Sequence, residues 1–153
     1  MLGSSGRKLA AVLTALLVPQ FAAGIERTTK LAPVKISDAW IRALPAGVPA
    51  AGYFRIHNAG TARLTMNRAE SSSCGTLMLH KTMKVAGRAD MEAMTMVDIS
   101  PGGDAVFEPG GYHLMCMNPA ASLKPGGKTN ITFFFSDGSK TDAEFVVRDA
   151  RGN

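Results

Sequence analysis

Turn-forming residues recur so often along this chain that they leave room only for short secondary-structure elements. The 153 residues include 16 glycines and 8 prolines, and triplets such as Pro101-Gly102-Gly103, Pro109-Gly110-Gly111 and Pro125-Gly126-Gly127 end successive apolar runs. No segment sustains a helical apolar stripe over three turns. Short apolar runs at spacings of roughly 8–12 residues are typical of all-β sandwiches and barrels. The sequence therefore predicts an all-β domain. Its roughly nine short strands are expected at residues 36–43, 51–57, 64–69, 76–83, 91–99, 105–108, 112–117, 131–135 and 143–147.

The N-terminal region has the three parts of a secretory signal peptide. Arg7 and Lys8 supply the positive part, residues 9–18 form an apolar stretch, and Ala22-Ala23-Gly24 offers small residues for a signal peptidase. A transmembrane helix needs about 20 apolar residues, so this stretch is too short for one. The alternatives are an uncleaved anchor and a buried N-terminal helix. We predict export to the periplasm, with no membrane span after cleavage. The expected organisation is a signal peptide at 1–24, a linker at 25–34 and one folded domain at 35–148.

Charge and motifs argue against two classes of function. The formal net charge is +5, and removal of Arg7 and Lys8 with the leader would reduce it to +3. No basic run carries interleaved aromatic residues, so we expect no nucleic-acid partner. No G-x-S-x-G motif or paired nucleophile and base is present, so we do not expect an enzyme.

Methionine and histidine provide the main chemical signal. Apart from Met1, all of the nine methionines lie between Met66 and Met117. Side chains two residues apart on a strand share a face, so His113 projects with Met115 and then Met117, and His80 projects with Met78. A methionine-rich core would also explain the clustering. The shared faces instead favour a ligand set of imidazoles and thioethers.

Such a ligand set has a selective chemistry. Thioethers are soft, neutral ligands that suit Cu(I), whereas magnesium and calcium require oxygen ligands. Structural zinc is usually held by cysteine thiolates at characteristic spacings, which this chain lacks. Methionine cannot form a disulfide, so it would keep binding Cu(I) in an oxidising compartment. The residues therefore point to a Cu(I) site.

The ligand spacing resembles that of a known family. His80, Met91, His113 and Met115 read H-x10-M-x21-H-x-M, which resembles the signature of the periplasmic copper-A chaperones, the PCu(A)C family. Residues 38–43 (DAWIRA) resemble the family's opening strand, 58–60 (NAG) its first turn, and 108–115 (EPGGYHLM) the segment with its second histidine. The resemblance covers roughly residues 36–147.

The resemblance implies a cupredoxin-like β-barrel. It also implies one Cu(I) bound by His80, Met91, His113 and Met115, and delivery towards the copper-A centre of cytochrome c oxidase, through its subunit II or an assembly factor. Family members often carry two methionines one residue apart at the second ligand, and here Met94 and Met96 have that spacing. Met91 has the family's spacing from His80, so it is the expected ligand, and Met94 is its alternative.

The two cysteines, His57 and Trp40 bear on the alternatives to a copper chaperone. Cys74 and Cys116 lie outside any CxxC motif and are expected to be two small buried side chains rather than a disulfide. A blue-copper electron carrier needs two histidines, a cysteine and a weak axial methionine, but Cys116 is expected to face away from His113. A metal-free β-sandwich assembly domain is the remaining rival. His57 is expected to be a surface or hydrogen-bonding histidine, and Trp40 a core residue.

Overall fold

The computed structural model describes residues 29–45 and 47–153, and this part of the chain is all-β. The predicted signal peptide and the first part of the predicted linker lie outside the described residues. The described part contains no helix long and apolar enough to cross a membrane. Ten strands form one mixed sheet, which confirms the all-β prediction. They are β1 (Val34–Arg42), β2 (Ala50–Asn58), β3 (Leu64–Glu70), β4 (Cys74–Val85), β5 (Arg88–Met94), β6 (Val97–Ile99), β7 (Asp104–Phe107), β8 (Tyr112–Pro119), β9 (Lys128–Phe135) and β10 (Lys140–Arg148).

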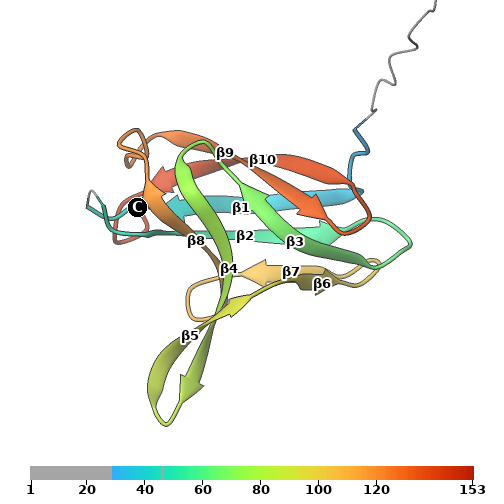
Figure 1. Cartoon of the computed structure of the whole chain (residues 1–153), viewed down its shortest axis with the longest axis horizontal. Helices are drawn as coiled ribbons and strands as arrows, with labels where there is room; N and C mark the ends of the chain where they lie inside the picture. Colours follow the sequence, from blue (N-terminus) through green and yellow to red (C-terminus); the bar gives the residue numbers. More distant parts are fainter. Residues whose placement is uncertain (1–28, 46) are drawn as a thin grey trace, which may run out of the picture.

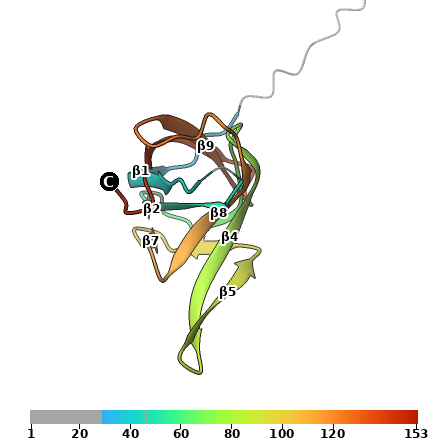
Figure 2. The same cartoon turned by 90° about the vertical axis from the view of Figure 1, so that its left-hand side faces the viewer.

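The sheet has the order β5-β4-β8-β7-β2-β1-β10-β9-β3-β6, and β8 also pairs with β2. The β1–β10 and β7–β8 pairs are parallel, and the other pairs are antiparallel. The sheet curls, so that β3 contacts β4 and β6 contacts β7. In Figures 1 and 2 the strands wrap around one interior, from which the β4–β5 hairpin projects.

The tenth strand arises because the predicted strand at 91–99 is two strands. Residues of β5 pair with β4, whereas Val97 and Ile99 in β6 are buried and pair with β3. Because β5 and β6 lie at opposite ends of the sheet order, the chain must leave the hairpin at Thr95 and Met96 and cross to the other edge. The prediction of one continuous strand was therefore wrong.

Inward-facing and outward-facing side chains alternate along the strands, and the inward-facing ones form an interior of aromatic and aliphatic residues. Phe54 is central to it, because its ring stacks on Phe107 at a centroid distance of 4.2 Å and contacts Phe133 at 4.9 Å. Trp40, expected in the core, is instead half-buried on the outer face of β1, with its ring 4.7 Å from that of Tyr53. Its neighbour Ile41 takes the core position and is fully buried.

The end of the predicted linker lies against the sheet. Leu31 forms a bridge with Lys140, and the backbone N–H of Ala32 donates to the Lys140 carbonyl oxygen at 2.9 Å. Lys30 pairs with Asp137 across 2.7 Å. The chain is therefore held along β10 before β1 begins.

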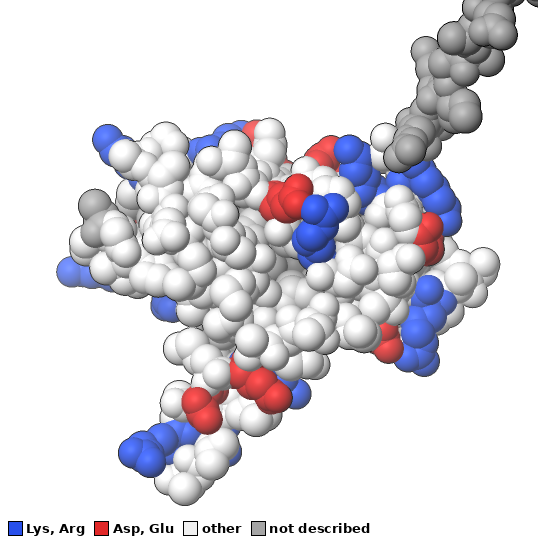
Figure 3. Space-filling model, in the orientation of Figure 1, with Lys and Arg blue, Asp and Glu red and all other residues white. Residues whose placement is uncertain are grey.

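The β4–β5 hairpin closes with a tight turn. Val85 pairs with Arg88, and the two residues between them have positive φ, 48° at Ala86 and 78° at Gly87. Two such residues make a type I′ turn, whose twist matches that of the flanking strands. Pairing between β4 and β8 ends at Lys81, and the Thr82 N–H donates to the Gly111 carbonyl oxygen at 3.0 Å. Beyond Thr82, the register found in the described residues pairs β4 with β5 alone. Figure 3 shows acidic and basic side chains on this projecting part.

A disulfide joins Cys74 at the start of β4 to Cys116 in β8, so the expectation of two unpaired cysteines was wrong. Their Cα atoms are 5.3 Å apart although the residues are 42 positions apart in sequence. The physical reason is the pairing of β4 with β8, which places Leu77 opposite Cys116 and Cys74 opposite Pro119. No local sequence pattern reports that pairing.

Candidate metal centre

Two cross-strand pairs on β4 and β8 form the centre of the candidate site. His80 lies opposite His113, and Met78 lies opposite Met115. Directly opposed residues of an antiparallel pair project from the same face, so these four side chains stand together. The residues between them face the interior, where Leu79 and Leu114 are 5% and 0% exposed. The core therefore forms a packed floor beneath the candidate ligands.

The two imidazole rings meet edge to face, with their centroids 5.7 Å apart and their planes at 70°. His113 is buried, and its Nδ1 lies 3.2 Å from the carbonyl oxygen of Gly111. A carbonyl can only accept, so Nδ1 carries the proton and donates it. This hydrogen bond fixes the tautomer and leaves Nε2 of His113 as the metal-binding nitrogen.

His80 has no such partner. Both of its ring nitrogens are buried and unbonded within the part of the chain that the structure describes. Burial lowers the pKa of His80 below its usual value, and the neighbouring His113 lowers it further. A neutral imidazole is the form that binds a metal. Because buried polar groups are nearly always satisfied, the two unpartnered nitrogens indicate a missing ligand.

The register of β5 distinguishes Met91 from Met94. Met91 lies opposite Thr82, two positions along β4 from His80, so it is on the same face as the imidazoles. Met94 lies opposite Leu79 on the other face, where it packs against the core. Of these two methionines of β5, it is therefore Met91 that stands on the face of the histidines.

Three more thioethers occupy or adjoin this face. Met115 is half-buried, Met78 is 38% exposed, and Met117 follows in the same row opposite Thr76. The predicted ligand set omits Met78, although its alternation with His80 places it on this face. The pairing of Met78 with Met115 is the feature that local sequence could not reveal.

In the described residues, this face offers no cluster of carboxylate or thiolate ligands. Among residues 29–45 and 47–153, no three His, Cys, Asp or Glu side chains gather in a way that could hold a metal ion. Both cysteine sulfurs are in the disulfide, so neither offers the thiolate that a blue-copper centre needs. The face between β4, β5 and β8 therefore offers two imidazoles and several thioethers, a set suited to Cu(I).

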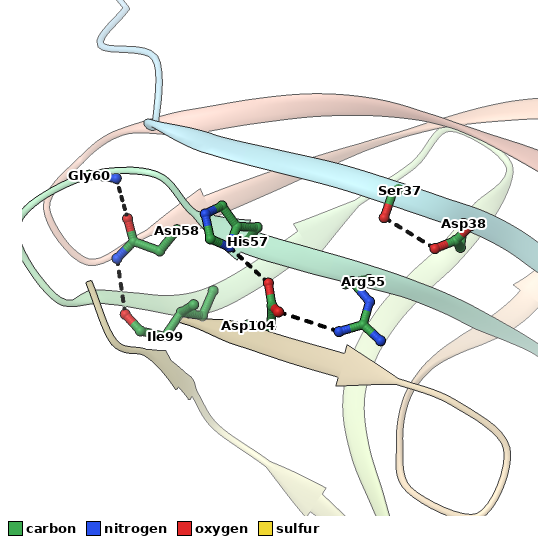
Figure 4. Close-up of polar contacts among 8 residues, drawn as sticks. All are labelled: Ser37, Asp38, Arg55, His57, Asn58, Gly60, Ile99 and Asp104. Atoms are coloured by element: carbon green, nitrogen blue, oxygen red, sulfur yellow. Dashed lines mark hydrogen bonds and ion pairs between the residues drawn. The ribbon is translucent and has the colours of Figure 1, made fainter. Parts of the chain in front are cut away.

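The third histidine lies elsewhere and has another role. His57, in β2, lies opposite Asp104 of β7, and its Nδ1 is 2.9 Å from a carboxylate oxygen of that residue. Arg55 approaches the other oxygen of Asp104 at 3.4 Å, as Figure 4 shows. The expectation of a hydrogen-bonding surface histidine is confirmed.

Residues 34–147 match a known family, described as "Putative lipoprotein LpqE-like". The chain belongs to the LpqE-like family. It is 35% identical over 120 residues to "Putative lipoprotein Lxx21020" of Leifsonia xyli subsp. xyli, covering 78% of this chain and 72% of that protein. It is 30% identical over 92 residues to "Uncharacterized protein RP573" of Rickettsia prowazekii, covering 58% of this chain and 49% of that one.

Solved structures share the fold of this LpqE-like chain. The "Copper-bound PCuAC domain from PmoF2" superposes with a TM-score of 0.64 at 18% identity, covering 78% of this chain and 95% of that domain. Apo-DR1885 of Deinococcus radiodurans gives 0.59 at 24% identity, covering 95% of this chain and 97% of that one. Its Cu(I) form gives 0.60 at 22%, covering 80% and 81%. These matches show the fold, and they confirm the PCu(A)C resemblance.

Proposed function

We propose that this protein binds one Cu(I) ion through His80, His113, Met91 and Met115 and passes it to an acceptor protein. The observation that carries the proposal is the opposed pair of imidazoles, one with a fixed tautomer and one with two unpartnered buried nitrogens. Two neutral nitrogens and two neutral sulfurs suit Cu(I) and leave the site with only the charge of the ion. The copper-bound PmoF2 domain and the Cu(I) form of DR1885, which share the fold, support the same choice of metal.

The cargo is expected to be handled outside the cytoplasm. The disulfide is stable in an oxidising compartment, the N-terminal pattern predicts export to the periplasm, and the family description is that of a lipoprotein. Thioether ligands keep their affinity there because they do not form disulfides. The acceptor we propose is the copper-A centre of cytochrome c oxidase, reached through subunit II or an assembly factor. We propose binding and transfer rather than catalysis.

Anaerobic Cu(I) titration against a competing chelator tests the site. His80→Ala is the better histidine variant, since His80 is only partly buried, whereas His113 is 4% exposed and its loss could disturb folding. Substitutions behind a metal ligand typically cost 10–100-fold in affinity, so loss of His80 itself should cost roughly 100-fold or more. The matched control is His57→Ala, which removes an imidazole bound to Asp104.

X-ray absorption on the loaded protein tests the ligand set. The proposal expects nitrogen and sulfur neighbours, with sulfur lost stepwise in Met91→Ala and Met115→Ala. Equal affinity of the unmodified protein, His80→Ala and Met115→Ala would contradict the proposed site. A spectrum with the intense blue colour of a copper–thiolate centre would favour the electron carrier instead.

A further inference from the structure

The face that carries the candidate copper site continues over β2 to β1 and β10. Strand pairing sets one row across it, in which each residue lies opposite the next: Met78, Met115, Ala51, Arg42 and Arg148. Opposed residues share a face, and neighbouring strands are about 4.8 Å apart. Two strand spacings therefore put the backbone of Arg42 about 10 Å from that of Met115. Figure 2 shows β1, β2, β8 and β4 following one another on this side.

The row next to it is aromatic. Trp40 lies opposite Tyr53, and Tyr53 follows Gly52, whose partner Leu114 is the neighbour of His113. The guanidinium of Arg42 lies 5.6 Å from the centre of the Tyr53 ring, and that of Arg148 lies 4.9 Å from the Trp40 ring. We call these four residues, Trp40, Arg42, Tyr53 and Arg148, the arginine–aromatic cluster.

Within the part of the chain that the structure describes, neither arginine of the cluster has a counter-ion. Among the described residues no carboxylate comes within ion-pair distance of Arg42 or Arg148. Asp149 is adjacent in sequence, but one of its oxygens accepts the backbone N–H groups of Arg151 at 2.8 Å and Asn153 at 3.0 Å. The cluster therefore presents two charges that nothing in this part of the chain neutralises.

Arg42 is also incompletely hydrogen-bonded. One Nη donates to the Tyr53 hydroxyl at 2.9 Å, but its Nε is buried without a partner in the described structure. An unpaired buried donor is costly, and a carboxylate can accept two parallel bonds from one guanidinium. The Nε of Arg42 is thus a donor that the described residues leave without an acceptor.

We propose that the arginine–aromatic cluster docks a carboxylate-bearing surface of the protein that exchanges copper with this chain. Tryptophan, tyrosine and arginine are the residue types most enriched where binding energy concentrates in interfaces. Copper exchange requires the partner's ligands to reach the histidines. A partner seated there also covers Arg42, which lies two strand spacings, about 10 Å, from Met115. This inference rests on the proposed function and names the partner's chemistry.

Two other occupants fit less well. Binding to anionic membranes typically uses clusters of 4–8 basic residues, and the cluster has two. A second copy of this chain seated symmetrically on the cluster would bring four uncompensated guanidiniums together, which like-charge repulsion opposes.

Copper transfer to a defined acceptor tests the proposal. The probe is the soluble copper-free domain of cytochrome c oxidase subunit II, and transferred copper is measured after rapid separation at low and high salt. In the Arg42→Gln/Arg148→Gln variant, transfer at low salt should slow roughly tenfold and lose most of its salt dependence, while Cu(I) affinity against a chelator stays unchanged. The control Arg63→Gln/Arg68→Gln removes two arginines that already have carboxylate partners and should transfer normally.

Each outcome decides a different claim. Equal transfer by both double variants, or no transfer from the unmodified protein that still binds Cu(I), would overturn the docking proposal and leave copper binding intact. Absence of Cu(I) binding by the unmodified protein would instead overturn the proposed function. Should the arginine double variant misfold, the single change Arg148→Glu repeats the test at one position. Vesicle binding with phosphatidylglycerol that depends on the arginines, with transfer unaffected, would assign the cluster to a membrane instead.

Discussion

Opening the Cys74–Cys116 disulfide should destabilise the domain strongly without changing its strand content. The bond links residues 42 positions apart. In the chain-entropy account, a closed loop of this size lowers the conformational entropy of the unfolded chain. This raises the free energy of unfolding by about 4 kcal/mol at 25 °C. Domains of this kind unfold with only 5–15 kcal/mol, so a large part of the stability should disappear. The loss should be less than the full figure if the reduced unfolded chain keeps residual structure.

Urea unfolding followed by circular dichroism measures this effect. The unmodified protein is compared with itself before and after reduction, which changes one bond and no side chain. Cys74→Ala/Cys116→Ala is a second arm, and it should lose more, because Cys116 is fully buried and the change also leaves a cavity. A loss below about 1 kcal/mol on reduction would refute the reasoning, as would a reduced protein whose β-structure has already disappeared in water.

Three further outcomes follow from the geometry. Met91→Ala should lower Cu(I) affinity at least tenfold and leave unfolding unchanged, whereas Met94→Ala should cost about 2 kcal/mol of stability and no affinity, as competition titration and urea melts would show. Because burial lowers the pKa of His80, protons should begin to compete for it only below its ordinary value of about 6.5. Cu(I) affinity should therefore stay constant as the pH is lowered to 6.5 and should fall only at lower pH. A decline that is already complete at pH 6.5 would contradict the lowered pKa of His80. Ala86→Asn should stabilise the hairpin by about 0.5 kcal/mol, since asparagine tolerates the positive φ better.

Much of the fold could be predicted because it depends on local alternation. Leu114 and Cys116 turn inward while His113 and Met115 turn outward, as period-two patterning requires. The turn signals placed most strand boundaries within a few residues. The split at Thr95 was missed because it reflects where the chain must go between two sheet edges, which no local pattern encodes.

The candidate site was predictable in composition but not in assembly. Shared faces grouped His80 with Met78 and His113 with Met115, yet only strand pairing shows that the two groups oppose each other. The same β4–β8 pairing accounts for the disulfide, and the pairing of β4 with β5 sets the position of Met91. Trp40 was misplaced for a related reason, since a large apolar side chain on the outer face is indistinguishable in sequence from a core residue until its neighbours are known.

The proposed ligands differ in how firmly the fold holds them, and this difference would set the order of steps in the proposed copper exchange. His113 is 4% exposed and tied to Gly111, so it has little freedom to leave the metal. Met91 is 57% exposed and lies on the projecting hairpin, where its side chain can move aside at little cost. An incoming ligand from a partner would therefore displace Met91 first, while His80 and His113, on the paired strands β4 and β8, still hold the ion. Copper would then pass through a shared intermediate rather than through free solution, which a toxic, reactive cargo requires.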